Sequence, residues 1–111
     1  MLASVNFPSS IDVLSTCERV LGVVYNNATV ETDGDYIFYI KVDGPFKRLL
    51  TDDNIRKTNG LLPIEVNPKY QGSPSVQIPK SGDLVEVYGA WIKFRTLDLN
   101  EIDPAWKVKI L

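Results

Sequence analysis

The sequence predicts an all-β domain that folds as a small five-stranded barrel with one short helix. Five segments rich in Val, Ile, Thr and Tyr are separated by clusters of Gly, Pro, Asn and Asp, which is typical of short strands joined by turns. The dipeptide Asp33-Gly34 favours a tight hairpin. In residues 84–95 the alternation of apolar positions changes phase near Gly89, which indicates a glycine bulge that coils the strand. A chain of 111 residues is long enough for one core, so residues 1–111 are expected to form a single domain.

The first part of the chain is expected to be an N-terminal extension, residues 1–17, that packs on the barrel. Ser9 or Ser10 is suited to cap a short helical turn there. The first strand, residues 18–25, is apolar on both sides, so both of its faces should be covered. After the hairpin, residues 36–42 form the second strand. Its core-facing residues are expected to be Tyr36, Phe38, Ile40 and Val42, and its outward residues Tyr39 and Lys41.

The middle of the chain contains the expected helix and the third strand. Thr51 can cap a helix whose first turn holds Asp52 and Asp53, and Gly60 can end it in the left-handed conformation. In residues 61–66 the even-numbered residues are expected to point inward and Glu65 outward. Pro63 cannot donate a ladder hydrogen bond, which favours an edge position or a bulge.

The last third predicts a connection followed by two strands. Residues 67–82 hold three prolines and two glycines without helical periodicity, and we expect a surface connection there. The fourth strand covers residues 84–95, and a turn follows at residues 97–100. The fifth strand covers residues 101–111, with Trp106, Val108 and Ile110 expected to point inward.

Two segments of this last third carry a resemblance to a protein family. The runs PKSGDLVEVYGAW and NEIDP are similar to the C-terminal hairpin of a family of small, uncharacterised OB-fold-like proteins. The matching residues are Pro79, Lys80, Gly82, Asp83, Val85, Gly89, Trp91, Asn100, Glu101, Ile102 and Pro104. The resemblance implies an OB-like Greek-key barrel and supplies no activity. Asp103 stands where the family pattern has histidine, and Leu99 where it often has tryptophan, so a ligand role of that histidine would be lost or altered here.

Composition restricts the classes of function. The chain has no histidine, which removes the commonest general base and the usual transition-metal ligand, so we expect no enzyme. The single cysteine, Cys17, excludes an internal disulfide and a cysteine zinc cluster, and we read it as a small buried residue. No cofactor is expected. No apolar run is long enough to cross a membrane and the N-terminus lacks an export signal, so a cytoplasmic protein without membrane contact is expected.

A binding function is therefore the leading hypothesis, with single-stranded nucleic acid as the ligand. OB barrels stack bases on aromatic rings and contact phosphates with Lys and Arg. The expected binding residues are Tyr39, Lys41, Lys47, Arg48, Lys93 and Arg95. Against this hypothesis, the net charge is −2 and acidic residues lie nearby in the sequence, so these side chains are equally consistent with an ordinary solvated surface.

Other interpretations stay open. A strand edge near Pro63, or residues 70–78, can recruit a protein partner or a second copy of the chain. Clustered acids at Asp33 and Asp35, or at Asp52 and Asp53, invite a cation, but hairpin geometry and the helix dipole account for them, and no metal site is expected. Glu101 and Asp103 would suit acid–base chemistry only if one were buried with a raised pKa. Trp91 and Trp106 fit core packing better than ligand stacking.

Overall fold

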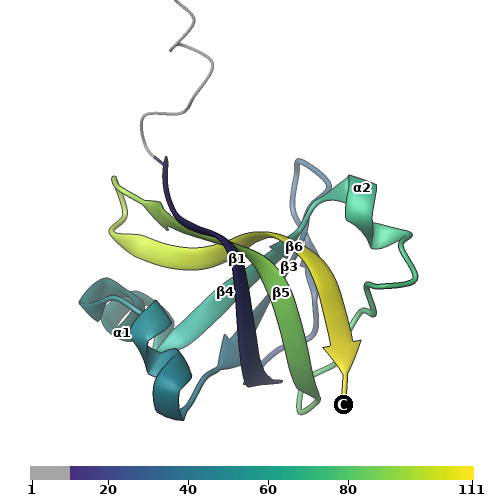
Figure 1. Ribbon diagram of the computed structural model, residues 1–111, viewed down its shortest axis with the longest axis horizontal. Coiled ribbons are helices and arrows are strands. Elements are labelled where there is room, and N and C mark those ends of the chain that lie inside the picture. The colour runs from purple at the N-terminus through teal and green to yellow at the C-terminus, as the bar shows by residue number, and fades with distance from the viewer. Residues whose placement is uncertain (1–10) are drawn as a thin grey trace, which may run out of the picture.

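The structure, a computed structural model, describes residues 11–111. Strands make up most of this part of the chain (Figure 1). The long strands are β1 (Ile11–Val24), β3 (Tyr36–Lys41), β4 (Leu61–Val66), β5 (Leu84–Phe94) and β6 (Leu99–Ile110), and β2 (Thr29–Val30) is a two-residue strand. The helical elements are a 3-10 helix η2 (Gly44–Leu49) and the α-helices α1 (Asp52–Thr58) and α2 (Pro68–Gln71). The expectation of an all-β domain is confirmed, but the sheet has six strands rather than five and there is more than one short helix.

Pairing follows the order β1-β5-β6-β4-β3-β2, and β1 also pairs with β3. The second contact of β1 involves Val23 opposite Lys41 and Val24 opposite Ile40. It depends on Gly22, because a Cβ there would lie 2.7 Å from the carbonyl oxygen of Lys41. In Figure 1, β1, β5 and β6 lie in front of β3 and β4, while α1 and α2 lie at opposite sides of the sheet.

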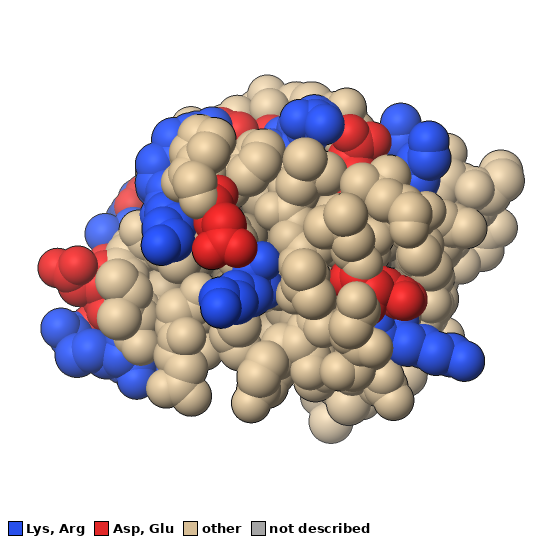
Figure 2. Space-filling model, turned by 90° about the horizontal axis from the view of Figure 1, so that it is seen from below, with Lys and Arg blue, Asp and Glu red and all other residues tan. Residues whose placement is uncertain are grey.

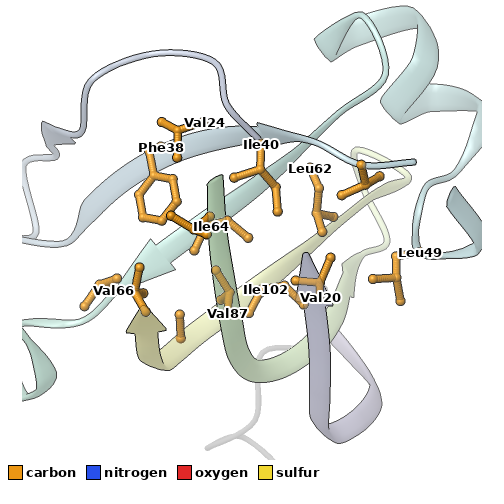
Figure 3. Close-up of a cluster of buried hydrophobic side chains, with 14 of the residues drawn as sticks. Val20, Val24, Phe38, Ile40, Leu49, Leu62, Ile64, Val66, Val87 and Ile102 are labelled. Carbon is orange, nitrogen blue, oxygen red and sulfur yellow. The ribbon is translucent and has the colours of Figure 1, made fainter. Parts of the chain in front are cut away.

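The core lies between these two groups of strands. Figure 3 shows Val20 and Val87 pointing toward Phe38, Ile40 and Ile64, which come from β3 and β4. The even-numbered residues of β4 and the predicted inward residues of the second strand are in or against this core, as expected. The expected inward position of Trp106 is wrong, because Ala105 is fully buried in its place.

β5 approaches β6 closely at Gly89. A Cβ on Gly89 would lie 2.4 Å from Cγ2 of Ile102 and 2.5 Å from the carbonyl oxygen of Pro104. The register with both neighbouring strands shifts beside this glycine, at the place where a bulge was expected. The extra residues, however, are on the partner strands. Gly89 pairs with Ala105 of β6 and Trp91 pairs with Ile102, so one residue lies between the two pairs on β5 and two residues lie between them on β6.

The N-terminal region differs from its expected structure. Residues 11–17, assigned above to an extension, are the first half of β1 and pair with β5 from Ile11 opposite Phe94 onward. The helical turn is therefore wrong for Ile11 to Leu14, and its suggested caps, Ser9 and Ser10, lie outside the described residues. Cys17 is exposed rather than buried.

The hairpin of Asp33 and Gly34 is confirmed, but it joins β2 to β3 and only Gly34 has a positive φ, of 89°. The capped helix at Thr51 is also confirmed, since the Thr51 side chain accepts from the Asn54 amide. Pro63 does not lie at an edge, because β4 pairs with β3 on one side and with β6 on the other. The β6 side of β4 has a single registered pair, Ile64 with Ile102, and this sparse pairing leaves room for a residue without an N–H.

Candidate functional site: a carboxylate centre and a lysine-lined hollow

Three carboxylates meet on the outer face of β4 and β6. Ile64 and Ile102 pair in parallel and both point into the core, so the residues beside them, Glu65, Glu101 and Asp103, point to the opposite face. One carboxylate oxygen from each of the three lies within 4.8 Å of the others. We call Glu65, Glu101 and Asp103 the carboxylate centre. Glu65 lies on the outer face, as its place in the strand predicts, but it is buried, with 8% of its surface exposed.

The turn before β3 adds further acids. Glu31, Asp33 and Asp35 bring oxygens within 4.8 Å of one another and of Glu65. The Glu31 N–H donates to the Asp35 carbonyl and the Asp35 N–H to Oδ1 of Asp33, both over 2.8–2.9 Å. Gln71 on α2 fixes the turn against β4, because its Nε2 donates to the carbonyls of Gly34 and Val66.

Burial and mutual repulsion shift the pKa values of these groups upward. Burial, with hydrogen bonding to Glu101 and Glu31, raises the pKa of Glu65 to about 11. Burial and the neighbouring Asp103 raise the pKa of Glu101 to about 7. Burial and the charge of Asp35 raise the pKa of Asp103 to about 6. Glu101 thus has the property that acid–base work would require, a buried carboxyl with a raised pKa.

Tyr39, a predicted nucleic-acid-binding residue, lies beside this centre. It is half-buried on β3 opposite Pro63 of β4. Burial and then the charges of Glu101, Glu31 and Glu65 raise the pKa of its hydroxyl. The ring therefore borders an acidic environment on one side. Lys41 lies on the other side of the ring, two residues further along the same face of β3.

Lys41 and Lys47 share a hollow of about 370 Å³ between the end of β3, η2 and α1. Its wall includes Asp43 and the apolar side chains of Leu50 and Ile55. A second hollow, of about 200 Å³, shares Lys41 and Asp43 with the first and extends to Phe46 and Leu84. Among residues 11–111, neither lysine takes part in an ion pair.

The other predicted binding residues are held by acids. Lys93 pairs with Asp98 at 2.8 Å, Arg48 with Glu18 at 2.9 Å, and Arg95 with Asp12. The guanidinium of Arg48 also lies 5.6 Å from the centre of the Trp91 ring. Trp91 packs against the core and its Nε1 donates to the Leu49 carbonyl, so it serves packing as expected. Figure 2 shows one face of the molecule, on which basic and acidic side chains are interspersed and no broad area is uniformly basic.

The structure thus brings Lys41 and Lys47 together, places Tyr39 two residues from Lys41 on the same strand, and leaves the other three cations in separate ion pairs. Sequence reasoning missed Glu65 as part of a site. The position of Glu65 one residue after Ile64 predicts the outer face correctly. Its burial, however, results from the approach of β6 and of the 31–35 turn, which the sequence does not reveal. No helix among the described residues has the length and apolar character that crossing a membrane demands. No protein-family model matches the chain, and a search of curated proteins found no similar sequence.

Proposed function

We propose that the protein is an OB-like barrel that binds single-stranded nucleic acid, without catalysis, at the hollow lined by Lys41 and Lys47. The barrel part rests on the strand pairings. Hydrogen-bonded neighbours run β1-β5-β6-β4-β3 and return to β1, so five long strands follow one another in a ring. This agrees with the family that the C-terminal hairpin resembles. In an OB barrel the second and third strands bear the ligand face, and these would be β3 and β4.

The nucleic-acid part of the proposal rests on two lysines that line one hollow and form no ion pair with any residue between 11 and 111. A volume of about 370 Å³ is within the range of small-ligand sites, about 300–1,000 Å³, and the wall combines cations with apolar side chains. A phosphate can contact Lys41 or Lys47 while its base packs against Leu50 and Ile55. Tyr39 lies two residues from Lys41 on the same face, close enough to stack on an adjacent base.

The acids limit the length of this site. The carboxylate centre beyond Tyr39 repels phosphate, and Lys93, Arg48 and Arg95 are already neutralised by carboxylates. The bound strand is therefore short and makes about two phosphate contacts. For a single strand, two contacts correspond to a slope of about −1.4 in a plot of log affinity against log salt concentration.

Fluorescence anisotropy with a labelled mixed-sequence oligonucleotide tests this proposal. At low salt we expect the double variant Lys41→Ala/Lys47→Ala to bind at least about tenfold more weakly than the wild type. Lys80→Ala/Lys109→Ala is the matched control, because both lysines are exposed, form no ion pair among residues 11–111 and line neither hollow around Lys41. Absence of binding at low salt, or an equal loss in the control, would refute the proposal.

A second candidate function, self-assembly, is favoured by one apolar pair. Val23 and Leu84 are cross-strand partners on β1 and β5, and both remain exposed, at 43% and 46%. Tyr25, also exposed, follows Val23 closely. A second copy of the chain is the expected occupant of this surface. Light scattering after size exclusion distinguishes the candidates: a dimer that Leu84→Gln dissociates, and that ignores oligonucleotides, supports assembly.

A further inference from the structure

The carboxylate centre contains a buried oxygen without a partner. Glu101 is 4% exposed, and its Oε1 is buried and accepts no hydrogen bond from any residue between 11 and 111. The same carboxylate faces Glu65 and Asp103, with one oxygen of each residue within 4.8 Å of the others. A buried acceptor without a donor costs about 1–3 kcal/mol, and more when it is charged. The position thus calls for a positively charged or hydrogen-donating ligand.

The protein itself supplies no cation to this position. In the described part of the chain, none of the ion pairs involves the carboxylate centre or the three acids of the 31–35 turn. Elsewhere in the molecule, by contrast, acids such as Glu18, Glu86 and Asp98 are paired with Lys or Arg. Buried carboxylates are ordinarily paired or coordinate metals. At this centre, within residues 11–111, no Lys or Arg compensates the acids, which leaves bound protons or a bound cation to do so.

We propose that Glu65, Glu101 and Asp103 bind one hard divalent cation such as Ca²⁺ or Mg²⁺. Every donor at the centre is an oxygen, since the chain has no histidine and Cys17 lies on β1. Carboxylate oxygens select Ca²⁺, Mg²⁺ and Mn²⁺ over softer metals.

The spacing of the oxygens fits a single ion. Ca²⁺ binds oxygens at about 2.3–2.6 Å, so two ligands on opposite sides of the ion are at most about 5 Å apart. The 4.8 Å limit among the three carboxylates therefore lets one ion contact all of them with little movement. The 370 Å³ hollow has room for an organic ligand, but it is lined by other residues and not by Glu101. The buried Oε1 of Glu101 therefore suits an ion better than an organic ligand.

The acids of the 31–35 turn extend the site toward solvent. Glu31 and Asp33 are exposed, whereas Asp35 is buried, and all three have an oxygen within 4.8 Å of Glu65. An incoming cation can first contact the exposed carboxylates of Glu31 and Asp33 and then move past Asp35 to the buried oxygens. The proposal is independent of nucleic-acid binding, because it uses none of the lysines of the hollow.

Calorimetric titration of the chelator-treated protein with CaCl₂, MgCl₂ or MnCl₂ alone tests the site. We expect one equivalent of at least one of these ions to bind and to raise the thermal midpoint of unfolding. Glu101→Gln should weaken binding at least about tenfold. This variant removes a buried charge rather than a packing group, so it is expected to fold, and its thermal midpoint without metal checks this.

Asp52→Asn is the matched control, since it removes one carboxylate charge from an exposed residue of α1 outside both acidic groups. It should bind the ion as the wild type does. Absence of binding at millimolar concentrations of all three ions would overturn the proposal and leave a cluster of carboxyls that share protons. Equal weakening in Glu101→Gln and Asp52→Asn would also overturn it, because that result indicates attraction by net charge alone.

Discussion

Asn54 of α1 and Asn100 of β6 hold each other by a reciprocal pair of hydrogen bonds. The Asn54 Nδ2 donates to the Asn100 carbonyl and the Asn100 N–H donates to Oδ1 of Asn54, both over 3.0 Å. Asn54 is fully buried and Asn100 nearly so. The same Oδ1 also accepts from the Thr51 N–H, which completes the capping box of α1. One side chain thus ties the start of the helix to the residue before Glu101.

Replacing this side chain should destabilise the fold strongly. Asn54→Ala removes the side-chain half of the capping box and takes partners from the Thr51 N–H and from the buried N–H and carbonyl of Asn100, so we expect a loss of about 2–4 kcal/mol in the free energy of unfolding. Urea unfolding measures this change. Ile55→Ala, an exposed substitution on the next residue, should change stability by less than about 0.5 kcal/mol. Similar losses in both variants would show that the pair does not have the role assigned to it.

Gly89 should be intolerant of any side chain. In Gly89→Ala the new methyl group would overlap Ile102 and the Pro104 carbonyl, and the backbone atoms there cannot move aside cheaply. We expect a loss of about 1–3 kcal/mol or more in unfolding free energy. Gly72→Ala is the control, because a Cβ there meets nothing within 4 Å and its φ is −91°. It should be neutral or slightly stabilising. A neutral Gly89→Ala would contradict the close approach of β5 and β6.

Much of the fold could be predicted because local chemistry and tertiary structure agree in it. The Thr51 cap and the Gly34 turn depend on neighbours close in sequence, and both are confirmed. The irregularity expected at Gly89 is present, but its extra residues are on β1 and β6 rather than on β5. The start of β1 could not be predicted in this way. Ser15, Thr16 and Cys17 show no clear alternation. They are in a strand because β5 pairs with Ser15 before them and with Glu18 after them, while Thr16 and Cys17 fall in the register shift between these two pairs.

The site residues were harder to predict because charge pairing is a tertiary property. Asp12 and Arg95 are 83 residues apart, and nothing in either segment indicates that they meet. Glu65 resembled an outward strand residue, and its burial depends on β6 and on the 31–35 turn. The condition stated for Glu101, burial with a raised pKa, is met in the structure, whereas the sequence contained only the alternation with Ile102.

The carboxylate centre predicts that stability falls as pH rises when chelator is present. The pKa of Glu101 rises from an ordinary 4.5 to about 7, that of Asp103 from 3.8 to about 6 and that of Glu65 from 4.5 to about 11, so the folded state holds more protons than the unfolded chain between about pH 4 and 11. The free energy of unfolding therefore decreases with pH across this window, by about 1.4 kcal/mol per pH unit for each such proton at most. Urea unfolding at several pH values measures the slope.

Glu101→Gln should make this slope shallower and should be more stable than the wild type at pH 8, because it no longer carries a buried charge. Asp52→Asn should keep the slope of the wild type, since that residue is exposed on α1. A wild-type stability that stays constant or rises from pH 5 to 8 would show that the centre is less buried than described.

Asp43 should limit the affinity of the hollow for phosphate. Its exposed carboxylate lines both hollows together with Lys41, so it opposes an anionic ligand there. A unit charge about 4 Å away is worth about 1 kcal/mol in water, which corresponds to a roughly fivefold gain in oligonucleotide affinity for Asp43→Asn at low salt. Anisotropy titrations measure the gain, which should vanish as salt screens the interaction. Asp52→Asn makes the same change in net charge outside both hollows and should alter affinity less than about twofold. If both variants gain equally, net charge explains the effect, and if neither gains, the oligonucleotide does not pass the hollow of Lys41 and Lys47.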